Sequence, residues 1–245
     1  MLAAVSRPDP TEESDRRERI AELRQLIARS AWHGPEPMPT GSPLDAILPQ
    51  GGLPRGAITE MHGPIGAGRM RVALLALIGA AKSGRGAVVD PMAMFYPPAA
   101  AALGMPLERM LLVRPRDPAR AAWAAEQIAR SGVAICVVVI DARVDDAHAR
   151  RLLRAAETGQ TALVLLAERP TGLPVALSLN VMPRGGEIVV EVMRSRMGFL
   201  GAKAIVAPIV APPLDDRATL PRPEPVAGIA IELRPPRTGE VGSGR

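Results

Sequence analysis

Aromatic residues, cysteine and long apolar runs are all scarce in this chain. Aromatic side chains make up 2% of its 245 residues, too few for a protein that binds single strands by stacking bases on aromatic rings. The one cysteine, Cys136, lies in an apolar run, which excludes a disulfide framework. No run of eighteen apolar residues free of charge is present, so no transmembrane helix is predicted. The acidic, proline-containing N-terminus does not resemble a secretory signal, and we expect a cytoplasmic protein without a membrane partner.

Lysine is scarce as well, although the chain is basic. Lys82 and Lys203 are the only lysines, whereas the formal net charge is +5 and the sequence pI is about 10.5. A basic chain favours an acidic partner, nucleic acid above all. The excess of arginine over lysine, together with much alanine, glycine and proline, is equally what a GC-rich genome produces. The charge therefore permits DNA contact, which we expect to be weak or indirect.

Two terminal segments flank the predicted core. Residues 1–34 start with a polar stretch predicted to be disordered and continue into an amphipathic helix over about 11–32. Its apolar face carries Ile20, Leu23 and Ile27, our candidate partner-binding residues. Such a stripe must be buried, either on the chain's own domain or on a partner subunit. Residues 201–245 are rich in proline and arginine, and we expect them to be irregular apart from a short strand near 228–233.

Strands and helices alternate between residue 40 and about residue 200. Buried strands are predicted at 57–62, 86–90, 110–113, 134–140 and 161–167, and helices at 69–82, 97–103, 118–131 and 145–158. Two further strands, at 176–182 and 187–194, flank a turn at 183–186 and are typical of a hairpin. The pattern predicts an α/β fold: a mainly parallel sheet flanked by helices, with an antiparallel hairpin at its edge.

A glycine-rich turn joins the first predicted strand of this core to its first helix. The phosphate-loop pattern is G-x-x-x-x-G-K-[ST] between a strand and a helix. Both of its glycines are present, as Gly63 and Gly68, with Gly66 between them, but Arg69 stands in place of the lysine and Met70 in place of the hydroxyl residue. A methionine does not bind Mg²⁺, which prefers oxygen, and a planar guanidinium is a poor substitute for an ammonium group in a tight loop. The sequence therefore predicts the loop without its chemistry.

The residues around this turn resemble the RecA family of recombinases. The matching stretches are Thr40–Asp45, Gly51–Glu60 and Gly63–Pro64, the strand end at Asp90, the helix at 119–131 and the apolar strand ending at Asp141. The resemblance covers about residues 40–195, and it implies a RecA-like P-loop core.

Three departures from the RecA pattern bear on activity. The carboxylate that RecA uses to activate water would lie two residues beyond Asp90, where this chain has Met92. Asp141 matches the aspartate that would hold the water shell of Mg²⁺, but with Met70 in the loop we do not expect it to hold a metal. The connections that form the two long DNA-binding loops of RecA are reduced to 142–144 and about 168–174. We therefore expect no catalytic residue, no ATP hydrolysis and no strand exchange.

The resemblance implies a vestigial nucleotide site and no cofactor, and we do not expect ATP to bind. The residues of that site are Gly63, Gly66, Gly68, Arg69, Met70 and Asp141.

Within the superfamily, the length and the altered loop are most similar to the ImuA family of accessory proteins. This resemblance implies a non-catalytic role in the SOS response, bridging or modulating RecA and an ImuB-like Y-family polymerase subunit during translesion synthesis. The N-terminal helix of RecA packs on the adjacent protomer, and the stripe at Ile20, Leu23 and Ile27 would do the same here, with 201–245 as a tether to the polymerase complex. Two alternatives stay open: a residual nucleotide- or DNA-binding module that acts as a ligand-gated switch, and a purely structural domain. The oligomeric state stays open too.

Two smaller groups of residues have simpler interpretations. Three histidines lack the spacing of metal ligands, and we expect ordinary histidines and no metal site: His33, His62 and His148. An apolar cluster directly after a predicted strand is either local core packing or an exposed contact patch: Met92, Met94, Phe95 and Tyr96.

Overall fold

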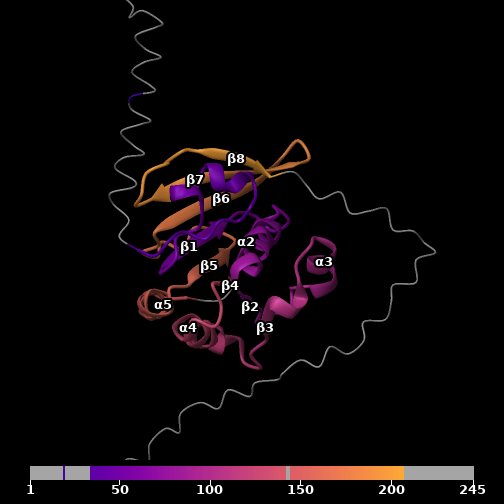
Figure 1. Ribbon diagram of the computed structural model, residues 1–245, viewed down its shortest axis with the longest axis vertical. Coiled ribbons are helices and arrows are strands. Elements are labelled where there is room, and N and C mark those ends of the chain that lie inside the picture. The colour runs from indigo at the N-terminus through magenta and orange to yellow at the C-terminus, as the bar shows by residue number, and fades with distance from the viewer. Residues whose placement is uncertain (1–18, 20–33, 142–143, 207–245) are drawn as a thin grey trace, which may run out of the picture. The chain divides into compact units, whose positions relative to one another are not determined.

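The computed structural model describes Arg19, residues 34–141 and residues 144–206. Within this part of the chain, eight strands form one sheet in the order β3-β2-β4-β5-β1-β6-β7-β8 (Figure 1). The strands are β1 (Ala57–His62), β2 (Gly86–Val89), β3 (Met110–Val113), β4 (Cys136–Ile140), β5 (Ala162–Ala167), β6 (Leu177–Arg184), β7 (Glu187–Ser195) and β8 (Lys203–Val206). The helices are α2 (Arg69–Ser83), α3 (Pro97–Ala102), α4 (Ala121–Ser131) and α5 (Asp146–Gly159), with short 3-10 turns at η1 (Pro43–Ala46), η2 (Pro49–Gly51), η3 (Leu107–Arg109) and η4 (Pro118–Arg120).

The parallel part of the sheet is covered on both faces. Strands β1 to β5 pair in parallel. β2, β4 and β5 are apolar and buried along nearly their whole length, as expected of strands covered on both faces. One core joins α2 to one face of the sheet, and a second core joins α4 and α5 to the opposite face (Figure 1). The predicted α/β fold with a mainly parallel sheet is confirmed.

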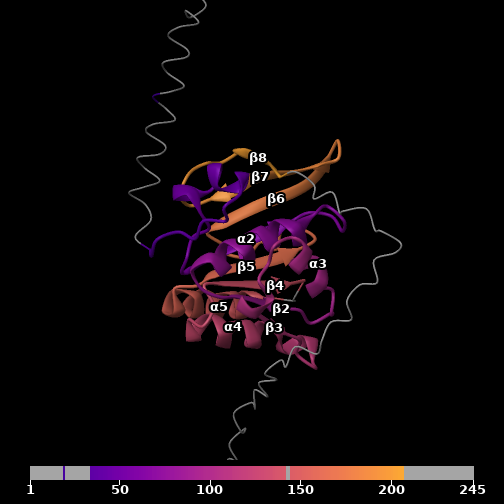
Figure 2. The same cartoon turned by 45° about the vertical axis from the view of Figure 1, so that its right-hand side comes forward.

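The antiparallel end of the sheet is larger than predicted. β6 pairs with β1 in parallel and with β7 in antiparallel orientation, which confirms the hairpin. β8 then pairs with β7 and becomes the edge strand. The expectation that the chain is irregular after Gly201 was wrong at 203–206, where four residues form β8. Figure 2 shows β6, β7 and β8 together at one end of the sheet, away from α4 and α5.

Other predictions fall on residues that the structure does not describe. The stripe at Ile20, Leu23 and Ile27 lies outside the described residues, as do His33 and residues 207–245. No helix among the described residues is long and apolar enough to cross a membrane.

Candidate functional site

The glycine-rich turn has the backbone form of a phosphate loop. It leaves the carboxyl end of β1 at Gly63 and enters α2 after Gly68, whose left-handed backbone (φ 94°) places it as the N-cap of the helix. The Gly68 carbonyl accepts the first helical hydrogen bond, from the Val72 N–H. Gly63 is required by packing, because a Cβ there would lie 2.1 Å from the Val181 carbonyl oxygen of β6. The turn is therefore fixed between β1, α2 and β6.

Arg69 points into the site and binds the aspartate at the end of β4. Its Nη1 donates a hydrogen bond of 2.8 Å to Asp141 Oδ1, and the relative exposures of the two side chains are 8% and 30%. Asp141 itself has a positive φ of 43°, and its N–H is bonded to the Leu166 carbonyl of β5. The two side chains that stand at the lysine and aspartate positions of the RecA pattern thus neutralise one another.

The remaining side chains do not fit a magnesium-bound triphosphate. Met70, the second residue of α2, is half buried and packs against the first core. Its thioether is not a ligand that Mg²⁺ prefers. Asp141 Oδ1 is already engaged by Arg69. Among the residues that the structure describes, no group of three or more His, Cys, Asp or Glu side chains is placed to hold a metal.

The aspartate at the end of β2 has a structural task. Asp90 is fully buried, and its carboxylate accepts hydrogen bonds from the N–H groups of Met94 (2.8 Å) and Phe95 (3.0 Å) and from Arg114 Nε (3.1 Å). Arg114 also donates to the Phe95 carbonyl at 2.6 Å. Every one of these bonds holds the connection between β2 and α3 in shape. Met92, at the position where RecA activates water, is 61% exposed.

The apolar cluster after β2 is divided between core and surface. Phe95 is buried, as the core interpretation requires, and anchors the connection. Met94 and Tyr96 are 54% and 62% exposed, and Met92 is exposed as well. The contact-patch interpretation requires all three side chains to be exposed. The core interpretation is therefore confirmed for Phe95, and a contact patch at the three exposed residues stays a prediction.

A buried carboxylate that sequence analysis missed lies in the middle of β1. Glu60 is 1% exposed and accepts hydrogen bonds from the Thr171 N–H (2.8 Å), the Thr171 hydroxyl and the Ser178 hydroxyl (3.0 Å). Arg194 Nη2 of β7 also donates to the Leu173 carbonyl at 2.6 Å. These bonds fasten the connection between β5 and β6 onto the sheet. A glutamate inside an apolar strand is the signal that would have pointed to it.

His62 lies on the same side of β1 as Glu60, directly before the glycine-rich turn. It is 6% exposed, and its Nε2 has no hydrogen-bond partner within the described part of the chain. Burial lowers the pKa of His62 below its usual 6.5, and the negative charge of Glu60 opposes this shift. The imidazole therefore favours its neutral form in the folded protein.

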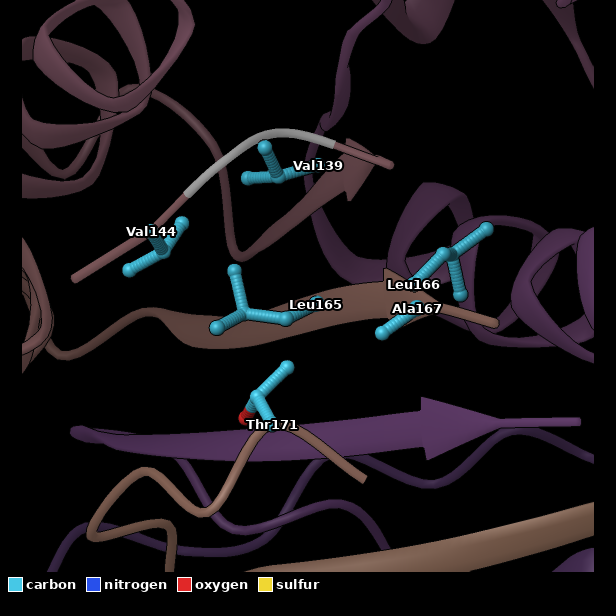
Figure 3. Close-up of a pocket in the computed structure, with 6 residues that line it drawn as sticks. All are labelled: Val139, Val144, Leu165, Leu166, Ala167 and Thr171. Atoms are coloured by element: carbon cyan, nitrogen blue, oxygen red, sulfur yellow. The ribbon is translucent and has the colours of Figure 1, made fainter. Parts of the chain in front are cut away.

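A small hollow lies at the carboxyl ends of β4 and β5. Its cavity volume is only about 10 Å³, room for about one water molecule, and it is lined by five apolar residues and one threonine: Val139, Val144, Leu165, Leu166, Ala167 and Thr171. Figure 3 shows these side chains arriving from the two strands and from the loops that follow them, with Thr171 pointing toward Leu165. The hollow is smaller than the pockets that hold drug-sized ligands, and it offers a hydroxyl as its only polar side chain.

The stretch before β1 that resembles RecA is also structural. The Asp45 carboxylate accepts hydrogen bonds from the Thr40 N–H (2.9 Å), the Thr40 hydroxyl (2.7 Å) and the Gly41 N–H (2.8 Å). Ser42 caps η1 through the Leu44 N–H. The other singled-out residues are ordinary too: His148 Nδ1 lies 2.7 Å from Asp145 Oδ1 at the start of α5, and Cys136 is buried in β4.

Comparison with known proteins places these features in one family. Residues 26–162 match the RecA N-terminal domain. A protein named RecA from Symbiobacterium thermophilum is 43% identical over 108 residues, which are 43% of this chain and 31% of that protein. RecA from Ruminococcus albus is 36% identical over 132 residues (49% and 33%), and RecA from Rhodospirillum centenum is 39% identical over 121 residues (49% and 34%). The chain spans about a third of the length of these relatives, and it belongs to the RecA N-terminal domain family.

Proposed function

We propose that this protein is a non-catalytic RecA-like accessory protein that acts in the response to DNA damage. The observation that carries the proposal is the ion pair between Arg69 and Asp141, which joins the two positions that would otherwise meet phosphate and Mg²⁺. Met70 and Met92 support it, since neither the hydroxyl nor the water-activating carboxylate of the RecA pattern has a replacement. A chain with this fold and these side chains contributes a surface and no ATP turnover.

The partners that we propose are RecA and an ImuB-like Y-family polymerase subunit, in translesion synthesis. The similarity to RecA proteins supports the first, because related folds share surface shape. The similarity of the altered loop to the ImuA family supports the second. A subunit that offers only one of the two complementary faces of a RecA-type protomer would end or dissolve a filament instead of extending it.

Direct DNA binding has a smaller part in the proposal. The connection after β5 is held to the sheet by Glu60 and Arg194, so it has neither the length nor the freedom of a DNA-binding loop. A basic chain retains a weak, salt-sensitive affinity for phosphate backbones. We expect DNA to be reached mainly through the partners.

The test is to titrate the protein onto RecA that is turning over ATP on single-stranded DNA. The expected result is a loss of RecA turnover and of sedimenting filament at substoichiometric protein, and a stable complex with the polymerase subunit in gel filtration. ATP hydrolysis by the protein alone, or the absence of both effects, would overturn the proposal.

The second function is a ligand-gated switch, and the preserved turn from Gly63 to Gly68 favours it. Backbone N–H groups at the start of α2 remain an anion site even without the lysine. In this case a nucleoside diphosphate would displace Asp141 from Arg69 and alter the affinity for a partner. Partner binding that changes with added nucleotide distinguishes the switch from the accessory role.

A further inference from the structure

One face of the sheet carries an apolar strip that no helix of the described residues covers. Along β6, β7 and β8, alternate residues pack with α2 in the first core. The remaining residues of these three strands point to the opposite face of the sheet, the face on which α4 and α5 cover the parallel strands. No described side chain of β6, β7 or β8 belongs to the second core. Met182, Met193 and Ile205 are 43%, 47% and 53% exposed there. We call Met182, Val189, Met193 and Ile205 the open sheet face.

Three members of this face are neighbours across the strands, and Met193 lies further along β7. Met182 pairs with Val189, and Val189 pairs with Ile205, so the three form one row over β6, β7 and β8. Side chains paired in this way lie about 5 Å apart on one face of a sheet. The next row holds the ion pair between Lys203 and Glu191, at 3.3 Å. An apolar row bounded by charges is the surface that an amphipathic helix covers.

The chain enters the described core beside this face. A Cβ built on Gly56 would lie 3.6 Å from Pro35 Cδ and 3.6 Å from Glu157 Cα. Gly56 precedes β1, and Glu157 is in the last turn of α5. Residues 34 and 35 therefore lie at the amino end of β1, on the side of the sheet that α5 covers. In the strand order of the sheet, β1 is followed by β6, β7 and β8.

The preceding residues have the right length and pattern to cover it. Arg19, which is described, has a helical backbone, and the sequence predicts a helix over about 11–32. Such a helix spans about 33 Å at 1.5 Å per residue, against about 26 Å for the eight residues of β6 at 3.3 Å per residue. Counted back from residue 34, Ile27 and Ile20 come about 10 and 21 Å along the helix, within the length of the open sheet face.

We propose that the N-terminal segment with Ile20, Leu23 and Ile27 docks on the open sheet face of its own chain, next to α5. The segment after Val206 is a poorer occupant, because Pro208, Pro212 and Pro213 break any helix there. Docking within the chain withholds the stripe from a second protomer. The protein then lacks the helix exchange by which RecA-like chains assemble with one another.

The first test uses thiol crosslinking, for which the chain is well suited. Cys136 is buried, and burial raises the pKa of its thiol to about 12, so it does not react in the folded protein. Ile20→Cys with Met182→Cys is treated with a short bismaleimide, and Ile20→Cys with Tyr96→Cys is the matched control. Tyr96 is 62% exposed in the connection between β2 and α3, and β2 lies four strands away from β6 in the sheet. The proposal expects a crosslink within one chain for the first pair, in about tenfold excess over the control pair.

Crosslinks between two chains, or equal yields from both pairs, would overturn the proposal. Hydrogen exchange of residues 16–30 provides a second measurement. Protection in the wild type should fall about tenfold in Ile205→Asp and stay unchanged in Tyr96→Asp. A wild type without protection there, or equal protection in all three proteins, contradicts docking. The proposed function has a separate readout, since RecA turnover tests it whatever the stripe contacts.

Discussion

Two connections at the carboxyl edge of the sheet, separated by β4 and β5, keep different parts of the RecA pattern. The connection from β1 to α2 keeps its glycines and its backbone turn, while Arg69 and Met70 stand at the positions of the reactive side chains. The connection from β2 to α3 keeps Asp90, which is buried and structural, while exposed Met92 stands where water would be activated.

The difference between the two connections indicates which residues the fold itself requires. Gly63 faces a carbonyl of β6, and Asp90 holds three donors inside the protein, so replacing either one disturbs packing. Met70 is half buried and Met92 is exposed. A methionine at either position leaves the backbone unchanged. The form of a nucleotide site thus persists where packing depends on it, independently of the chemistry.

The largest effect is expected from Gly63→Ala. The new Cβ would lie 2.1 Å from the Val181 carbonyl oxygen, so β1 and β6 must separate locally. We expect a loss of roughly 3 kcal/mol of unfolding free energy, measured by urea denaturation. Gly66→Ala is the control: its Cβ meets nothing within 4 Å, and only the positive φ costs about 1 kcal/mol. Equal losses for the two variants would show that packing does not hold the turn.

The next effect distinguishes the two strand-end aspartates. Asp90→Ala leaves two buried N–H groups and Arg114 without their acceptor, and we expect a loss of about 3 kcal/mol. Asp141→Ala breaks a pair in which the aspartate is 30% exposed, and we expect about 1 kcal/mol. Denaturation of both variants in parallel checks the order. A more damaging Asp141→Ala would make the ion pair a structural element and weaken its assignment as a disabled site.

A pH effect is expected from His62. Burial holds its pKa below the unfolded value of 6.5, so the unfolded chain binds a proton more readily than the folded one. Its contribution to stability is therefore complete above pH 6.5 and is lost as the pH falls from there through the folded pKa. His62→Gln should flatten the profile of unfolding free energy between pH 8 and about pH 5. An unchanged slope in the variant would mean that other groups carry the pH dependence.

The smallest effect is expected from Met92→Glu. The side chain is exposed, so stability should change by less than about 0.5 kcal/mol. ATP hydrolysis should remain absent, because Met70 and Arg69 are unaltered, and a coupled-enzyme assay measures it. A gain in turnover would show that the β2 connection alone disables the site.

The fold was largely predictable because its signals are local. Apolar strands, amphipathic helices and the glycine-rich turn each lie within a short stretch of sequence, and the RecA resemblance ordered them. β8 was missed because its four residues are followed by a proline-rich sequence and gain their strand conformation only by pairing with β7.

The contacts of the candidate site were less predictable than the fold. Arg69 and Asp141 are 72 positions apart, and Glu60 and Thr171 are 111 apart, so no local pattern shows that these side chains meet. Asp90 accepts hydrogen bonds from both exposed Met94 and buried Phe95, so which of these side chains enters the core depends on the folded path of the connection.

The most direct test of the disabled site is calorimetric titration of the purified protein with Mg²⁺–ATP and with a non-hydrolysable analogue, at low millimolar nucleotide. The predicted result is no heat of binding and no shift in thermal midpoint, since a ligand that binds the folded state would raise it. The double variant Arg69→Lys with Met70→Thr serves as the comparison, in which any restored affinity would appear. Micromolar binding to the wild type would contradict the proposal and leave the ligand-gated switch in its place.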